Sequence, residues 1–150
     1  MLRLEPLLSA EISLAAPQEL GDTPQGRRRI INITGGTFSG ARLKGRVLPG
    51  GADWQVVRED GVAVLDTRYT LETHDGALIY VQNRGLRHGS KEVIKRLTDG
   101  ETVDPSLYYM RTQPSFETGD LRYAWLNRIV CVGTGERLAA AVKLQMYEVK

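Results

Sequence analysis

Six glycines interrupt residues 29–54, a segment with the sequence RIINITGGTFSGARLKGRVLPGGADW. They are Gly35, Gly36, Gly40, Gly45, Gly50 and Gly51. Short β-rich runs lie between them, without the apolar spacing of a helix. Because glycine accepts positive φ angles and allows close backbone approach, it marks turns, bulges and barrel corners. The segment therefore predicts strands that bend sharply together into a curved container.

β-Rich runs also cover most of the remaining sequence. Strands are expected at residues 2–14, 28–34, 43–48, 53–58, 62–73, 77–84, 108–116, 124–132 and 141–149. Between two of them, Asp75-Gly76 suits a type I′ hairpin turn. About nine short strands with turn residues at this spacing are typical of a sandwich or a barrel. We expect positions 1–150 to form one all-β domain.

One segment has a helical pattern instead. In Ser90–Leu97, SKEVIKRL, the residues Val93, Ile94 and Leu97 share one helical face. Ser90 is a suitable N-cap, and Gly100 ends the helix. Asp104-Pro105 resembles a second helix start. A short helix within a β-chain is expected to cover one end of the barrel.

The composition excludes several classes of protein. The net charge of +2 is too small, and the Lys and Arg residues are too scattered, to predict nucleic-acid binding. The basic run Arg27–Arg29 is interpreted as a solvated strand entrance. The N-terminal segment lacks the continuous apolar core of a signal peptide, and no stretch reaches the length of a membrane span. We therefore expect a cytoplasmic protein with no membrane partner.

The sequence also predicts neither a metal nor a cofactor. A single cysteine, Cys131, excludes a disulfide within the chain, and its apolar surroundings indicate a buried hydrophobe rather than a nucleophile. The two histidines, His74 and His88, are too far apart to indicate a metal centre. His74 is expected in solvent, whereas His88 is either a surface loop residue or a general base. No nucleotide-binding glycine loop is present, because GGTFSG is not followed by a helix.

A polar stripe in residues 62–73 suggests chemistry. Asp66 and Arg68 share one face of this strand, while Leu65, Tyr69 and Leu71 share the other. One interpretation is a solvent face with ion pairs across strands. In the alternative, Asp66 and Arg68 line a polar cavity, and the apolar residues contact an outer layer or a second subunit. The pattern alone leaves both open.

Other segments supply further candidates for ligand contact. Asp53 follows a glycine turn at the start of a strand, and the strand ending NRG has polar residues where functional groups often lie. The alternation Tyr123, Trp125, Asn127 resembles either a ligand wall or two core aromatics with a bonded amide. The candidate ligand-binding residues are Tyr80, Asn83, Arg84, Arg111, Phe116, Trp125 and Asn127.

Four ordered blocks resemble a known family. They are GGTFSGARLKGRVLPGGADWQ, DTRYTLETHDGALIYVQNRGLRHG, YYMRTQPSFETGDLRYAWLNR and VGTGER. They are similar to the bacterial and fungal family called domain of unknown function 3237, or uncharacterised protein family 0311. The resemblance spans nearly the whole chain. It implies a closed antiparallel, calycin-like β-barrel of about eight to ten strands, whose interior fits one small ligand.

The resemblance also gives a functional expectation, since some relatives in natural-product or aromatic-compound pathways are associated with isomerase or cyclase activity. We expect a cofactor-independent isomerisation, cyclisation or lyase step on an aromatic or carbonyl compound. The candidate catalytic residues are Asp66, Arg68 and Asp53. An aspartate would act as acid or base, and arginines would stabilise an enolate or phenolate oxygen.

Two other functions remain open from the sequence. The same pocket would serve a non-catalytic carrier or sensor of a small aromatic or anionic ligand, and a filled barrel would serve a structural role. The partner expected in the first two cases is a small molecule. A homodimer is also expected, because an outward face with Leu65, Tyr69 and Leu71 would need to be covered.

Overall fold

Pairing between the first strand and two distant strands closes the sheet on itself. In this computed structural model, which describes residues 1–150, β1 (Leu4–Leu14) pairs antiparallel with β10 (Ala141–Val149) on one side and with β3 (Gly26–Ser39) on the other. Gly36 lies in this second pairing, with a φ of +145°. A Cβ atom there would lie 2.3 Å from the carbonyl oxygen of Glu11, so the close approach of the two strands requires glycine.

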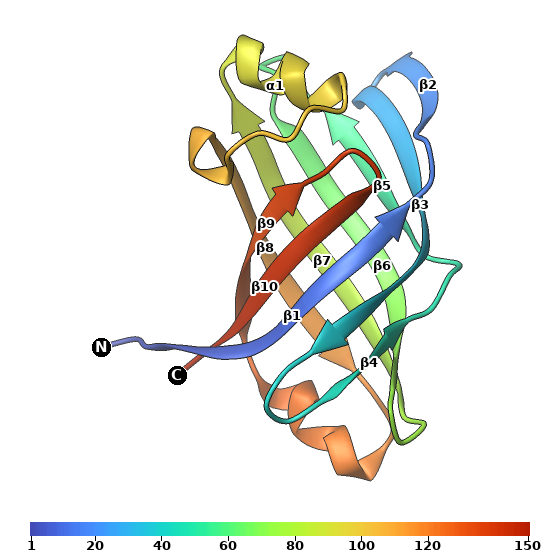
Figure 1. The fold of residues 1–150 in the computed structure, drawn as a ribbon, viewed down its shortest axis with the longest axis vertical. Coiled ribbons are helices and arrows are strands. Elements are labelled where there is room, and N and C mark those ends of the chain that lie inside the picture. The colour runs from blue at the N-terminus through green and yellow to red at the C-terminus, as the bar shows by residue number, and fades with distance from the viewer.

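Ten strands occupy eight positions around this barrel (Figure 1). From β1 the order runs through β10, β9 (Cys131–Arg137), β8 (Tyr108–Glu117), β7 (Leu78–Gly89) and β6 (Ala63–Thr73). Next, β4 (Lys44–Val47) and β5 (Ala52–Val57) share the position between β6 and β3. β2 (Gln18–Thr23) extends β3 as a hairpin. The predicted closed antiparallel barrel of eight to ten strands is confirmed.

The helix α1 (Lys91–Thr98) lies at one end of the barrel (Figure 1). The Ser90 hydroxyl accepts a hydrogen bond from the backbone N–H of Val93, which confirms the predicted cap. Leu97 belongs to a small cluster of buried residues under this helix. Asp104 caps the single turn η1 (Pro105–Leu107), as the sequence also predicted.

The opposite end is closed by the 3₁₀ segment η2 (Leu121–Arg128), so the strand predicted at 124–132 is wrong. The Asp120 carboxylate accepts from the backbone N–H of Arg122 and starts this segment. Two short helical pieces meet here at a kink at Tyr123, and the buried residues are Tyr123 and Leu126 rather than the alternate positions of a strand. The following strand, β9, begins only at Cys131.

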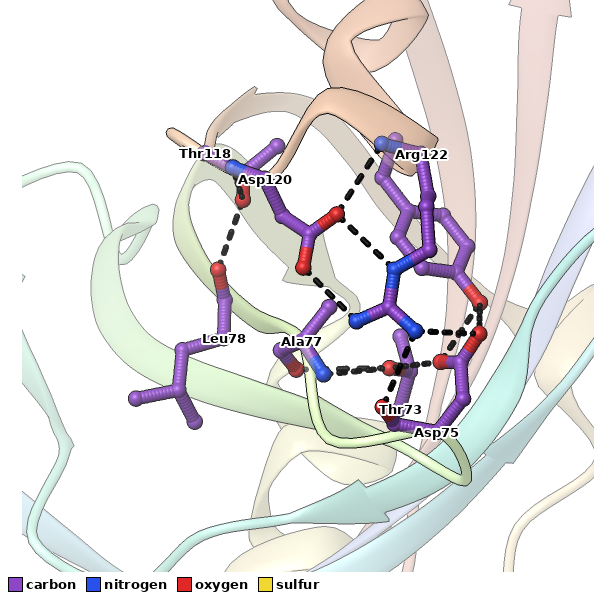
Figure 2. Close-up of polar contacts among 8 residues, drawn as sticks. Thr73, Asp75, Ala77, Leu78, Thr118, Asp120 and Arg122 are labelled. Carbon is purple, nitrogen blue, oxygen red and sulfur yellow. Dashed lines mark hydrogen bonds and ion pairs between the residues drawn. The ribbon is translucent and has the colours of Figure 1, made fainter.

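A polar network holds η2 against the β6–β7 turn (Figure 2). The Arg122 guanidinium forms ion pairs with Asp120 and Asp75, and the Tyr123 hydroxyl donates to Asp75 Oδ1 over 2.8 Å. In this turn only Gly76 has a positive φ, whereas a type I′ turn would need one at Asp75 as well. The predicted turn type is therefore wrong, although the hairpin itself is present.

Two apolar clusters fill the barrel from its two ends. The larger, with 19 buried residues, includes Tyr69, Leu71, Phe116 and Tyr123 and extends to η2. The smaller has six buried residues and lies under α1. Polar side chains from the inner face of the sheet lie between them. None of the helices is both long and apolar enough to cross a membrane.

Candidate functional site

A small polar cavity lies between the two apolar clusters. The space open to the centre of a water molecule measures about 40 Å³. Apolar residues of both clusters line it, among them Ile12, Leu65 and Leu144. The polar residues in its lining are Asp53, Gln55, Thr67, Asn83, Arg87, Thr112 and Arg137. Strands β5, β6, β7, β8 and β9 each contribute at least one of them, so the site exists only in the closed barrel.

Asp53 is the acidic residue of this cavity. It pairs with Ile31 and Thr67 on neighbouring strands, which places its side chain inside, where the residue is only 9% exposed. Its Oδ1 accepts from the backbone N–H of Asp66 over 2.9 Å, and its Oδ2 accepts from Gln55 Nε2 over 3.1 Å. Burial raises the pKa of Asp53 above its ordinary value, although these bonds and the nearby Arg87 oppose the shift. A carboxyl whose pKa is raised by burial is a candidate for general acid–base chemistry.

Gln55 is fully buried and fixes Asp53 from the next inward position of β5. Its Oε1 accepts from a guanidinium nitrogen of Arg29 over 3.0 Å. Because arginine only donates, the amide nitrogen of Gln55 must face Asp53. Arg29 itself is paired with Glu19 over 2.9 Å. A chain of polar contacts thus runs from the surface to the carboxyl group.

Two arginines face the cavity without an anionic partner. Arg87 is 9% exposed, and neither Arg87 nor Arg137 takes part in any ion pair of the structure. Burial, with a smaller contribution from Arg137, lowers the pKa of Arg87 to about 10. Burial and the nearby Arg29 likewise lower the pKa of Arg137. Both guanidinium groups therefore lie in a site of excess positive charge.

The same two arginines also line a second space on the side of α1. It measures about 100 Å³ and includes Arg29, Ile94 and Leu97 in its lining. Since Arg87 and Arg137 belong to both linings, they stand between the cavity and this vestibule.

Two polar atoms in the cavity wall have no hydrogen-bond partner in the chain. They are Asn83 Oδ1 and Thr112 Oγ1, and both are inaccessible to bulk solvent. A buried polar atom without a partner costs free energy, so such atoms normally bind water or a ligand. Asn83 Oδ1 and Thr112 Oγ1 are therefore free to hydrogen-bond a water molecule or a ligand in the cavity.

Three of the predicted site residues lie inside the barrel. Asp53 and Asn83 line the cavity. Phe116 is also inside, but it packs in the larger apolar cluster and is absent from the cavity lining. Two of the predicted residues, one acid and one amide, therefore line the cavity, and their roles stay predictions.

The cavity-lining alternative for Asp66 and Arg68 is wrong. Both point outward, and Asp66 Oδ2 lies 3.5 Å from an Arg68 nitrogen and Oδ1 lies 3.7 Å from Arg84 Nε. The inner face of β6 belongs to Leu65, Tyr69 and Leu71, because the apolar side chains gain more from burial. These three side chains therefore cannot contact a second subunit. The homodimer stays a prediction, but this apolar face no longer supports it.

Tyr80, Arg84 and Arg111 also lie on the outer face of the barrel, where all three are exposed. Arg111 extends over the Tyr109 ring, with 5.6 Å between its Cζ and the ring centroid. His88 is exposed, as its surface interpretation predicts, but it lies in β7 and not in a loop, and its ring stacks on that of Tyr109 with 4.8 Å between the centroids. None of these residues lines the polar cavity.

Trp125 and Asn127 lie in η2 and do not form a ligand wall. The Arg42 guanidinium lies 3.5 Å from the centroid of the Trp125 ring, a cation–π contact at the closed end. Asn127 forms two hydrogen bonds of 2.9 Å with the backbone of Thr118. Both residues close the barrel end, far along the chain from the acid of the site.

Sequence reasoning missed Gln55, Arg87 and Arg137 as site residues. Arg87 has the same period-two parity as Asn83, so counting through Gly85 would have placed both on one face. Arg137 and Gln55 had no comparable signal. Cys131 is buried as predicted, and burial raises its thiol pKa to about 11. No group of three or more His, Cys, Asp or Glu side chains is placed to hold a metal ion.

Comparison with known proteins finds similar sequences along almost the whole chain. The family model described as "Protein of unknown function (DUF3237)" matches residues 2–149. A UPF0311 protein of Clostridium acetobutylicum is 40% identical over 149 residues, which cover 99% of this chain and 94% of that protein.

Solved structures show the same fold. A β-barrel-like protein of Acinetobacter baumannii has a TM-score of 0.88 at 52% identity, covering 100% of this chain and 97% of that one. A conserved protein of unknown function from Rhodopseudomonas palustris has a TM-score of 0.97 at 38% identity, covering 100% and 99%. A chain described as an enzyme from Penicillium herquei has a TM-score of 0.74 at 22% identity, covering 99% and 95%, which shows the fold alone.

Proposed function

The chain belongs to the DUF3237 family, and we propose that its barrel binds a small carbonyl compound in the polar cavity and transfers a proton through Asp53 without a cofactor. The observation that supports this most is the buried Asp53 carboxyl with its raised pKa, held beside Arg87 in a cavity with unpartnered polar atoms. Acids whose pKa is shifted by burial cluster at catalytic sites, where they act in general acid–base chemistry.

The reaction that fits this arrangement begins at a carbon next to a carbonyl group. Asp53 takes the proton from that carbon, and the electron pair moves to the carbonyl oxygen as an enolate. The Thr112 hydroxyl, which has no partner in the chain, donates a hydrogen bond to the negative oxygen. Return of the proton at another atom completes an isomerisation, whereas ring closure or loss of a neighbouring group gives a cyclisation or a lyase step.

The cavity walls also indicate the kind of substrate. No Phe, Tyr or Trp side chain lines the cavity, so we propose a small carbonyl compound and not an aromatic one. The Thr112 hydroxyl can donate a hydrogen bond to one of its oxygens, whereas Asn83 Oδ1 can only accept one, from a hydroxyl group or a water molecule. The small volume excludes a large substrate unless part of it lies in the vestibule beside α1. The relative from Penicillium herquei is described as an enzyme, which is compatible with catalysis in this fold.

Hydrogen–deuterium exchange at carbon tests the proton transfer directly. The protein is incubated in D₂O with pyruvate, levulinate, 2-butanone or cyclopentanone, and loss of the α-proton is followed by ¹H NMR. We expect accelerated exchange for at least one compound, and a loss of about 100-fold or more in Asp53→Asn. Arg68→Gln, on the outer face, is the matched control and should keep the rate. Absence of exchange with every compound, or an unchanged rate in Asp53→Asn, overturns the proposal.

A carrier or sensor is the second candidate, and the unpaired Arg87 and Arg137 favour it, since they bind an anion without any chemistry. For a carrier, the small molecule binds equally well to the wild type and to Asp53→Asn, and no exchange at carbon occurs. The presence of a polar cavity argues against a structural protein with a filled barrel.

A further inference from the structure

We propose that the molecule bound in the cavity carries a carboxylate, and that the guanidinium groups of Arg87 and Arg137 bind it. The inference rests on the proposed function, because it concerns the same cavity, and it names the substrate class as small oxo acids. It concerns recognition and not proton transfer, so the two can fail separately.

The first argument is the missing counter-ion. Arg87 is 9% exposed, and no carboxylate of the chain lies within ion-pair distance of Arg87 or Arg137. A buried cation without a partner is costly, and buried arginines in proteins are normally paired. The Arg137 guanidinium donates only one hydrogen bond, a long one of 3.5 Å, to the carbonyl oxygen of Ala141. Both guanidinium groups thus remain available to bind a ligand.

The second argument is the charge balance. Arg29 is already neutralised by Glu19, and Asp53 is the one acidic residue in the lining of the cavity and the vestibule together. If Asp53 is ionised, as a general base must be, Arg87 and Arg137 leave one positive charge in excess. A single carboxylate balances it, whereas a phosphate dianion leaves an excess of negative charge.

The third argument is the position of the two groups. Arg87 and Arg137 stand at the boundary between vestibule and cavity, while Asp53, Asn83 and Thr112 lie in the cavity. A carboxylate held at this boundary directs the remaining carbon atoms toward Asp53. The planar fork of arginine matches the two oxygens of a carboxylate. The acid group therefore orients the substrate, and the carbonyl group reacts.

Calorimetric titration of the full chain tests this inference. The probes are acetate, pyruvate and levulinate, with methyl levulinate as the uncharged match and inorganic phosphate as the competing anion. We expect at least one carboxylate to bind, levulinate to bind at least 10-fold more tightly than its ester, and phosphate to bind more weakly. Arg87→Gln and Arg137→Gln should each weaken binding at least 10-fold. Arg68→Gln and Arg84→Gln remove surface arginines and should leave binding unchanged.

The outcomes separate this inference from the proposed function. Equal binding of ester and acid, tighter binding of phosphate, or no binding of any carboxylate overturns the inference, whereas exchange at carbon by Asp53 would still support the proposed function. Carboxylate binding that depends on both arginines, without exchange at carbon, supports the inference and indicates a carrier. If Arg87→Gln does not fold, Arg137→Gln gives the same test, because thermal melting in the absence of probe shows which variant is folded.

Discussion

Gln55 Nε2 donates a hydrogen bond to Asp53 Oδ2 over 3.1 Å, and both side chains are buried inside the barrel. Adjacent inward positions of one strand thus hold an acid and the amide that orients it. Because Arg29 fixes the other end of the amide, Asp53 has a defined orientation toward the cavity without a second acidic group. This arrangement leads to the first of four predictions.

Replacing Gln55 by leucine should destabilise the protein by about 1–3 kcal/mol, because a buried carboxylate oxygen loses its donor. Urea denaturation followed by tryptophan fluorescence measures the free energy of unfolding. Gln113→Leu is the control, since Gln113 is exposed on β8 and should give a change close to zero. Equal stability of Gln55→Leu and Gln113→Leu would show that the contact with Asp53 contributes nothing.

Asp53 should make stability depend on pH in a defined direction. Its pKa is raised by burial from the ordinary value of 3.8, so the folded state binds this proton more tightly than the unfolded state. The stabilising contribution is present below the unfolded pKa and is lost as the pH rises through the folded pKa. Asp53→Asn lacks this proton. The melting temperature of the variant minus that of the wild type should therefore increase between pH 4 and pH 7, and a flat or falling difference would contradict the raised pKa.

Arg68 and Arg87 should both tolerate replacement by leucine, for different reasons. Arg68→Leu removes a long ion pair on the outer face, so stability should change by no more than about 0.5 kcal/mol. Arg87→Leu removes a buried cation without a partner, so in the absence of a ligand its stability should be equal to that of the wild type or higher. Thermal melting without added anion measures both. If Arg87→Leu lowers the free energy of unfolding by more than about 2 kcal/mol, Arg87 has a structural role.

A methyl group at Gly45 should destabilise the barrel where β4 pairs with β6. A Cβ atom there would lie 2.0 Å from the carbonyl oxygen of Glu72, and neither strand can move without breaking the pairing. We expect Gly45→Ala to lower the free energy of unfolding by about 1–3 kcal/mol, the usual range for overpacking. Gly119→Ala meets no atom within 4 Å and serves as the control in the same chemical denaturation series. Similar midpoints for the two variants would refute the close approach.

Much of the fold was determined locally by the sequence. Glycine turns and β-branched runs indicated the strands, and Ser90 together with Val93, Ile94 and Leu97 indicated α1 correctly. Local patterns succeed there because backbone conformation depends on near neighbours. The same logic failed at Tyr123–Asn127, where alternation resembled a strand, because Tyr123 and Leu126 pack into the core at a spacing of three.

The site was decided by the tertiary structure. A period of two shows that Asp66 and Leu65 lie on opposite faces, but only closure of the barrel determines which face is inside. Asp53, Asn83, Arg87 and Arg137 come from three strands, β5, β7 and β9, that meet because β1 pairs with both β3 and β10. The sequence named Asp53 and Asn83 individually. Their meeting with two unpaired arginines depends on contacts between residues far apart in the chain, which no local pattern encodes.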